Sequence, residues 1–531
     1  MVRVLTVFAV LLAIAGGQTE RWVYRYDGPG NSGDWANSLV AGGDGNVYAA
    51  GTSYGILNDF TVISLTPSGA ERWAYRYSGT RKSGGVANSV VEGPDGNIYA
   101  AGSSTDTVKL LTVISLTPTG TERWVYRHHY PNGDVSWANS AVTDADGSTY
   151  AAGTRGGTSG GFIVVSVDSS GAERWVYRYT NPGGSGDEAQ SVAADTDGNI
   201  YAAGLSTDSA TGVDFTVVSL TSGGAERWVY RYNGPGNSGD VANSLIAGAD
   251  GNVYVAGTST GTGYDFTVIS LTASGSERWV YRYNGPGNSS DGAYSLVRGA
   301  DGNVYAAGVS TGSEGFDDFT VVSLTSGGAE RWVYRYNGPG NYVDEASSLV
   351  VGADGNIYAA GPTTGSGANY DFTAISLTSG GAERWVYRYD GPGNSDDFAN
   401  SLVAGPDGNI YAAGSSTGSD STYDFTVISL TSGSGIAEVG PLAGNTAFGL
   451  AVGTIKNRAL AYILKLPKPA TVSLSLCDLQ GRKLASWQVT VSKGSSQHTR
   501  NLPDLGSGVY FLTAEVPGKG LRENRKLIVA Q

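Results

Sequence analysis

Aromatic and charged residues alternate along a short segment that recurs through most of the chain. The segment reads Arg-Trp-Val-Tyr-Arg-Tyr or a near copy, and successive copies start 51 or 53 residues apart. Side chains of a β-strand point alternately to opposite faces, so Arg72 and Arg76 share one face of such a strand, and Trp73 and Tyr75 share the other. The eight copies are marked by their tryptophans, Trp22, Trp73, Trp124, Trp175, Trp228, Trp279, Trp332 and Trp385.

Three further strands are predicted in each repeat. In the first repeat, small residues at 36–40 precede the turn Asp44-Gly45-Asn46, an apolar run at 47–51 follows, and a polar loop leads to 59–65. Asp-Gly between two such runs favours a tight hairpin, because Gly adopts the positive φ that the turn needs. Each repeat is therefore predicted to be a four-stranded antiparallel meander, which at this period is typical of a β-propeller blade.

The phase of the repeats predicts how the propeller is closed. The chain opens with an Arg-Trp strand at 20–26, whereas the last repeat ends after 424–431 without one. We therefore predict that strand 20–26 completes the eighth blade with 397–431 and closes the ring. The predicted fold is all-β: an eight-bladed β-propeller over residues 20–431. The 80 glycines and 32 tyrosines agree, because Gly disfavours long helices and Tyr favours strands.

Residues 20–431 resemble the bacterial β-propeller repeat family labelled SBBP. The resemblance rests on the core Asp-Gly-Asn-x-Tyr-x-x-Gly, which occupies 44–51 in the first repeat. It implies a propeller fold and an extracytoplasmic location, and it implies no single activity.

The N-terminus has the pattern of an export signal. Arg3 precedes an apolar run at 4–15, and small residues suited to cleavage follow up to Gly17. This run is too short to span a bilayer, so we predict a signal peptide at 1–17 that is removed on export. No other stretch has the length and apolarity of a transmembrane segment. The mature protein is expected to be soluble and secreted, or held at the cell surface.

The composition changes beyond the repeats. We expect residues 432–445 to be a linker and residues 446–531 to be a small β-sandwich. Its predicted strands are 461–466, 470–477, 483–491, 508–516 and 525–530.

Roughly the last 65 residues resemble the C-terminal sorting domain of the type IX (Por) secretion system. The residues that carry this resemblance are 470–483, 505–511 and 525–529. It implies export with the cargo and recognition by the secretion machinery at the outer membrane, often followed by removal or exchange for a surface anchor. The basic final residue frequent in that family is absent, because the chain ends Ala530-Gln531. A plain immunoglobulin-like domain is the alternative.

Charge is distributed unevenly along the chain. Residues 436–531 hold 12 Lys or Arg and 5 Asp or Glu, which leaves 22 and 43 for residues 1–435. Sixteen of those 22 cations are the paired arginines of the repeated strand, such as Arg72 and Arg76. We expect these arginines to bridge adjacent blades, stacked on aromatic rings or paired with Asp. The remaining loops are strongly acidic, which argues against nucleic acid and anionic membranes as partners.

The sequence predicts no cofactor and no metal site. Cys477 is the single cysteine and the chain has three histidines, so an intramolecular disulfide and a thiolate metal site are excluded, whereas ion sites made of carboxylates alone remain open. The segments that begin at Asp144 and Asp195 are similar to the start of a calcium loop, but their Gly comes two positions early and the distal Glu is missing. We interpret both segments as turns.

The repeats diverge most between residues 78 and 161. Four of the five cations that lie outside the repeated strand and the signal fall there, together with two histidines and an extra tryptophan. We predict that they lie on one rim, on the face formed by the loops between blades and the loops between second and third strands. A basic and aromatic patch on an acidic ring suits an anionic or saccharide ligand, although divergence of early copies explains the same pattern. The candidate ligand-binding residues are Arg81, Lys82, Lys109, His128, His129, Trp137 and Arg155.

The sequence leaves two functional classes open. The first is a binding or structural module for a glycan or protein ligand. The second is an extracellular carbohydrate-active enzyme, a glycosidase or lyase, whose site lies on the same rim. No nucleophile elbow or metalloprotease motif is present, but two catalytic carboxylates can be hidden among 43. We therefore predict no catalytic residues.

Overall fold

The computed structural model describes two parts of the chain. These are residues 20–432 except 56, 82, 158–159 and 182–185, and residues 449–529 except 457–458, 467, 479–481, 492–493, 503–507 and 517–520. The predicted signal peptide and most of the predicted linker lie outside the described residues. The two parts belong to separate compact units, and each is described by itself.

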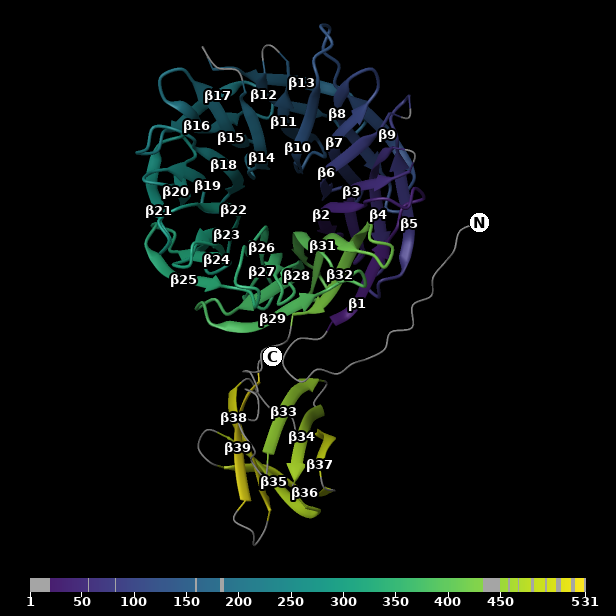
Figure 1. Ribbon diagram of the computed structural model, residues 1–531, viewed down its shortest axis with the longest axis vertical. Helices are drawn as coiled ribbons and strands as arrows, with labels where there is room; N and C mark the ends of the chain where they lie inside the picture. The colour runs from purple at the N-terminus through teal and green to yellow at the C-terminus, as the bar shows by residue number, and fades with distance from the viewer. Residues whose placement is uncertain are drawn as a thin grey trace. The chain divides into compact units, whose positions relative to one another are not determined.

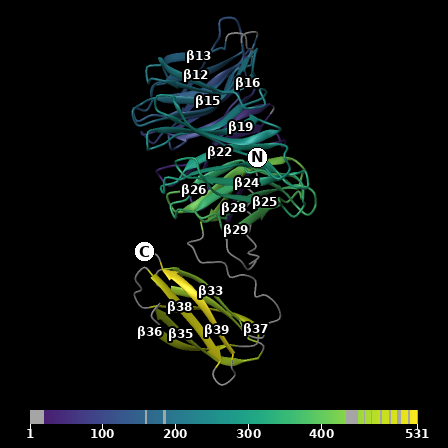
Figure 2. The ribbon, with the colours of Figure 1, turned by 90° about the vertical axis from the view of Figure 1, so that its left-hand side faces the viewer.

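The first unit consists of eight four-stranded antiparallel sheets, numbered here in chain order. Sheet 1 contains β2 (Trp35–Ala41), β3 (Val47–Tyr54), β4 (Asn58–Leu65) and β5 (Glu71–Tyr77). Figure 1 shows the sheets following one another around a common centre, and Figure 2 shows them from the side. The all-β meander predicted for each repeat is confirmed, and eight such sheets are consistent with propeller blades.

Sheets 2 to 7 repeat the order of sheet 1. Their strands are β6 (Gly85–Glu92), β7 (Ile98–Thr105), β8 (Lys109–Leu116), β9 (Glu122–Arg127), β10 (Ser136–Thr143), β11 (Thr149–Arg155), β12 (Gly161–Val167), β13 (Glu173–Tyr179), β14 (Glu188–Ala194), β15 (Ile200–Asp208), β16 (Gly212–Leu220), β17 (Glu226–Tyr232), β18 (Val241–Ala247), β19 (Asn252–Thr260), β20 (Tyr264–Thr272), β21 (Glu277–Tyr283), β22 (Asp291–Arg298), β23 (Val304–Thr311), β24 (Asp317–Leu324), β25 (Glu330–Tyr336), β26 (Ser348–Val351), β27 (Ile357–Thr364), β28 (Tyr370–Leu377) and β29 (Glu383–Tyr389).

Sheet 8 combines strands from opposite ends of the unit. It contains β30 (Asp397–Ala404), β31 (Asn409–Thr417), β32 (Tyr423–Thr431) and the N-terminal strand β1 (Glu20–Tyr26). Strand β1 pairs antiparallel with β32, with Val23 opposite Ile428 and Tyr26 opposite Phe425. The first described strand therefore supplies the outer strand of sheet 8.

Neighbouring sheets pack through buried aromatic and aliphatic side chains and through two repeated hydrogen bonds. In sheet 1, Tyr48 and Phe60 pack against Ala87 and Ile98 of sheet 2. The outer strand of each sheet adds a hydrogen bond from a tyrosine hydroxyl to a glutamate in the next sheet. These pairs are Tyr24–Glu71, Tyr75–Glu122, Tyr126–Glu173, Tyr177–Glu226, Tyr230–Glu277, Tyr281–Glu330, Tyr334–Glu383 and Tyr387–Glu20. Tryptophans of the same strand donate to the next sheet too, as Trp73 Nε1 does to the Pro118 carbonyl at 3.0 Å.

The repeated arginines correct one expectation. Arg76 pairs with Asp59, and Arg72 donates to Ser64 Oγ at 2.9 Å, and all of these partners lie in the same sheet as the arginine. The expected pairing with Asp is confirmed, but the expected bridge between sheets is wrong for these arginines. Four arginines in the position of Arg72 also donate to a carbonyl just after the third strand of the next sheet; they are Arg123, Arg227, Arg278 and Arg384. The alternation of residues along a strand shows on which face of the sheet a side chain lies. It does not show whether the partner of that side chain belongs to the same sheet or to the next one.

A buried aspartate fixes the loop that enters most of the sheets. Asp34 is fully buried, and its two carboxylate oxygens accept the backbone N–H groups of Gly28 and Tyr54, each at 2.6 Å. The same residue type occupies this place in sheets 4 to 8, as Asp187, Asp240, Asp291, Asp344 and Asp397. Sheets 2 and 3 have Gly85 and Ser136 there instead.

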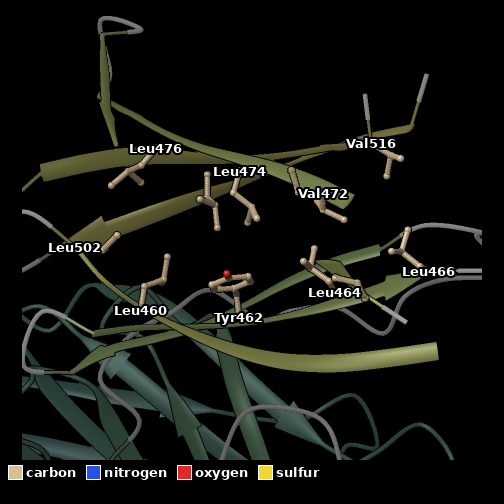
Figure 3. Close-up of a cluster of buried hydrophobic side chains, with 12 residues drawn as sticks. Leu460, Tyr462, Leu464, Leu466, Val472, Leu474, Leu476, Leu502 and Val516 are labelled. Carbon is tan, nitrogen blue, oxygen red and sulfur yellow. The ribbon is translucent and has the colours of Figure 1, made fainter. Parts of the chain in front are cut away.

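The second unit contains two sheets. The first is three-stranded, with β33 (Gly449–Lys456), β34 (Ala459–Leu466) and β37 (Gly494–Asn501). The second is four-stranded, with β35 (Ala470–Asp478), β36 (Lys483–Val491), β38 (Gly508–Val516) and β39 (Leu521–Val529). Leucines of β34 and β35 meet in one buried cluster, with Tyr462 among them (Figure 3). Strands β33 and β37 were not predicted.

The described residues include no helix that is long and apolar enough to cross a membrane.

We predict that removing β1 destabilises the first unit. A variant that begins at Asp27 lacks the partner of β32 and the glutamate that accepts the Tyr387 hydroxyl, so it should aggregate or melt at least several degrees below a variant that begins at Gln18. Differential scanning calorimetry measures the difference. Equal melting temperatures for the two variants would show that β1 is dispensable.

Stability should fall as the pH rises from about 4 to about 7. Burial raises the pKa of Asp34 to about 7 and those of Asp344 and Asp397 to about 6. In the unfolded chain an Asp has a pKa of about 3.9. The folded protein therefore binds protons more tightly than the unfolded chain in this window, and raising the pH removes that advantage. Thermal melts across the window test this, and the Asp34→Asn variant should show a shallower fall. A melting temperature that rises from pH 4.5 to 7 would contradict the prediction.

Candidate binding face

The two edges of the sheets carry different connections. On one edge are short turns such as Asp44–Asn46, where the Asp44 carboxylate accepts Asn46 N at 2.9 Å and the Tyr48 hydroxyl at 2.7 Å. On the other edge are the longer loops that join successive sheets and that join second to third strands. We call this second edge the loop face. Lys109 begins β8 and Arg155 ends β11, so both lie at the loop face.

The segments similar to calcium loops form turns. The Asp144 carboxylate accepts Asp146 N, Ser148 N and the Tyr150 hydroxyl within 3.0 Å. These donors occupy the oxygens that a cation would need. In the described part of the chain, no three His, Cys, Asp or Glu side chains are grouped as metal ligands.

Two of the predicted arginines are paired with aspartates. Arg155 donates to Asp134 Oδ2 from Nε at 2.8 Å and from Nη2 at 2.5 Å. Arg81 Nε lies 3.0 Å from Asp106 Oδ1, and the Arg81 side chain is 65% exposed. His129 is exposed, and Lys82 lies outside the described residues.

His128, Arg155 and Arg178 surround Tyr130 in the loop that enters sheet 3. The guanidinium carbons of Arg155 and Arg178 lie 4.6 and 5.1 Å from the centre of the Tyr130 ring. The His128 ring meets Tyr130 edge-on at 4.7 Å, and its Nδ1 is 3.3 Å from Glu173 Oε2. His128 is only 6% exposed, and burial lowers the pKa of its imidazole. Tyr130 thus organises a cluster of two arginines in which the buried histidine is an inner member.

Lys109 and Trp137 form a second contact of this region. The Lys109 ammonium lies 4.5 Å from the centre of the Trp137 ring, within the range of a cation–π interaction. Because Lys109 belongs to sheet 2 and Trp137 to sheet 3, the contact joins the loop faces of these two sheets. The structure thus places two of the predicted site residues, Lys109 and Trp137, in direct contact.

Two further cations of this region were not predicted from the sequence. In six sheets the second arginine of the repeated strand pairs with an aspartate of the third strand. The six pairs are Arg25–Asp424, Arg76–Asp59, Arg231–Asp214, Arg282–Asp265, Arg335–Asp318 and Arg388–Asp371. In sheets 2 and 3, Leu110 and Gly161 stand at the position of that aspartate. Neither Arg127 nor Arg178 forms an ion pair with a described carboxylate, and Arg127 Nη1 is buried without a hydrogen-bond partner there. These two replacements are the signal in the sequence that could have revealed both arginines.

A small pocket lies elsewhere on the loop face. It has a volume of about 100 Å³ and is lined by residues of sheet 6 that include Glu314, Phe316 and Arg335. It contains none of the predicted site residues.

Comparisons with known proteins leave the chain without a family. No family model matches it, and no curated protein does. It is similar to a solved structure described as the eukaryotic initiation factor, at 10% identity over 87% of this chain and 90% of the other, with a TM-score of 0.35. It is also similar to a protein of unknown function from Dyadobacter fermentans DSM 18053, at 10% identity over 78% of this chain and 99% of the other, with a TM-score of 0.36. These values are too low to transfer a fold or a function.

Proposed function

We propose that this protein is a secreted or surface-displayed β-propeller that acts as a binding module, and that its ligand is an anionic glycan held at the loop face of sheets 2 and 3. The observation that carries the proposal is the loss of the aspartate partner of Arg127 and Arg178 in these two adjacent sheets. A guanidinium without a carboxylate is suited to a sulfate or carboxylate group, because its planar N–H groups match such anions in pairs.

Charge around these arginines supports an anionic ligand. The region has four further cations, Arg81, Lys82, Lys109 and Arg155. Two of them are paired with aspartates, Arg81 with Asp106 and Arg155 with Asp134. Residues 1–435 as a whole have 43 acidic side chains against 22 cations. A local excess of positive charge on an acidic protein concentrates anionic ligands at that place.

The architecture in this proposal is an eight-bladed ring of the SBBP type, closed by β1. Its support is the pairing of β1 with β32 and the series of tyrosine–glutamate hydrogen bonds, which includes both Tyr387–Glu20 and Tyr24–Glu71. Pairing with β1 covers the edge of β32 that would otherwise be unpaired.

Export in this proposal depends on both ends of the chain. Residues 1–17 act as a signal peptide, and residues 446–531 act as a type IX sorting domain. Support for the second role comes from the resemblance of residues 470–483 and 505–511, and from the opposite charge of this part of the chain.

The binding site is tested by restoring the missing carboxylates. Leu110→Asp and Gly161→Asp copy the residue of the other six sheets, so they should leave the fold intact while neutralising Arg127 and Arg178. Dextran sulfate is the probe and uncharged dextran of the same length is its control. Calorimetry should show tighter binding of the sulfated polymer to the wild type, weakened by added salt, and a loss of about tenfold or more in the double variant.

Three further variants sharpen this test. Ser326→Asp introduces a similar charge in a turn on the opposite edge and should leave dextran sulfate binding unchanged. Trp137→Ala and Arg155→Ala should each weaken binding by about 1–3 kcal/mol. Equal affinity for dextran and dextran sulfate, or unchanged binding in the Leu110→Asp/Gly161→Asp variant, would defeat the proposed site.

The export role predicts that a variant ending at residue 435 folds but stays inside the native host. Its melting temperature should equal that of the first unit in the full chain, and immunoblots should find it in the cell fraction. Normal appearance of this variant in the medium or at the cell surface would show that residues beyond 435 do not direct export.

A further inference from the structure

One contact position on the loop face differs between otherwise similar sheets. The position two places before the Phe or Leu of a third strand corresponds, in the next sheet, to the position directly after the Asp, Gly or Ser that precedes or begins the first strand. Lys109 and Trp137 occupy these two positions at one junction and are in contact. At the junctions around sheet 8 both members are aromatic. Tyr370 meets Phe398 with ring centres 5.5 Å apart, and Tyr423 meets Trp35 at 5.9 Å. The corresponding residues at other junctions are Asn58 and Val86, Gly160 and Glu188, Val213 and Val241, Tyr264 and Gly292, and Asp317 and Glu345.

These two aromatic pairs join into one row. Phe398 and Tyr423 are 6.0 Å apart between ring centres, and Trp35 and Tyr54 are also 6.0 Å apart. Five rings, Tyr370, Phe398, Tyr423, Trp35 and Tyr54, thus run in sequence across sheets 7, 8 and 1. All five side chains are half-buried, so the surrounding structure holds the rings while part of each remains accessible.

Acidic rather than basic groups accompany the row. The Asp396 carboxylate accepts Tyr370 N at 3.0 Å. Burial raises the pKa of Tyr370 and Tyr423, and the negative charge of Asp396 raises both further, which places this carboxylate near both rings. Arg25, the nearby cation of sheet 8, is already paired with Asp424 at 2.5 Å. The row is therefore unsuited to an anionic ligand.

A second exposed aromatic pair lies on the loop face at the junction of sheets 6 and 7. Phe316 and Tyr342 have ring centres 4.5 Å apart, and the two residues are 37% and 50% exposed. This pair adds further exposed aromatic surface to the loop face.

We infer that the row from Tyr370 to Tyr54 binds a neutral oligosaccharide chain. A sugar ring has an apolar C–H face that stacks on an aromatic ring and a rim of hydroxyl groups that donate to a carboxylate such as that of Asp396. Successive aromatic rings match a ligand made of successive sugar rings. This surface lies on other sheets than the anion site and takes a ligand of different charge, so the inference does not depend on the proposed function.

The internal repeats supply the variants for the test. Val86 and Val241 stand at the positions of Trp35 and Phe398 in other sheets, so Trp35→Val and Phe398→Val should preserve the fold. Melting curves verify this for each variant. Trp137→Val removes the aromatic ring from the same position in sheet 3 and is the matched control.

The wild-type protein is first screened on an array of neutral, anionic and cationic oligosaccharides, and it should bind at least one neutral oligosaccharide of four or more sugars. The neutral oligosaccharide that binds most strongly is then the probe for calorimetry. Trp35→Val and Phe398→Val should each weaken its binding by about tenfold or more, while Trp137→Val should leave it unchanged. Binding of dextran sulfate should show the opposite pattern, unchanged in Trp35→Val and weakened in Trp137→Val.

Each contrary outcome overturns the inference by itself. These outcomes are retention of no neutral oligosaccharide, wild-type affinity in both valine variants of the row, and retention of cationic oligosaccharides alone. A loss of dextran sulfate binding in Trp35→Val would instead indicate one shared surface. Failure of the dextran sulfate experiments alone would remove the proposed anion site and leave the row intact.

Discussion

The stability of each sheet in the first unit depends on a neighbouring sheet on both sides, because both faces of its inner strands are apolar and must be buried. In β3, Val47, Tyr48, Ala49 and Ala50 are all fully buried although successive side chains point to opposite faces. A sheet of this kind is unstable alone, and its hydrophobic surface is covered only when sheets lie against both faces. The Tyr–Glu hydrogen bonds of the outer strands fix the spacing of sheets whose cores are already in contact. Pairing of β1 with β32 gives the last sheet the outer strand that this arrangement requires.

The same constraint explains which parts of the fold were predictable. Strands with strong alternation and Asp-Gly turns were identified from the sequence because their side-chain pattern is dictated by burial and by the positive φ of residues such as Gly45. Strand β37 reads Gly-Ser-Ser-Gln-His-Thr-Arg-Asn, which has no hydrophobic alternation, so no pattern predicted it. The expectation that the repeated arginines bridge neighbouring sheets was wrong for another reason. The position of the paired Asp depends on register, which places Arg76 directly opposite Thr61 and within reach of Asp59 in the same sheet.

The candidate sites were predictable only where a repeat loses a residue or gains an unusual one. Lys109 and Trp137 stand out in the sequence as extra charged and aromatic residues, and they are in contact. Arg127 does not stand out, because it matches the repeat; the change is in its missing partner, Leu110. The aromatic row was missed because Tyr370, Phe398 and Tyr423 are unremarkable singly in a chain with 32 tyrosines and 12 phenylalanines. Only the packing of one sheet on the next makes them continuous.

Two surfaces of different character can share one face because the contacts that hold the sheets together lie elsewhere. The buried tyrosines and the hydrogen-bonded strands recur from sheet to sheet, so the junction residues at the loop face are free to change without altering the core. Lys109 and Trp137 occupy one junction, while Tyr423 and Trp35 occupy another on the same type of backbone. The two surfaces differ in charge. Sheets 2 and 3 lack the aspartates that would pair with Arg127 and Arg178. Sheet 8 has the ion pair of Arg25 with Asp424 and also Asp396. The surface therefore varies through single residues at equivalent positions of a repeated scaffold, and in both proposals the identity of the junction pair sets the chemistry of the ligand.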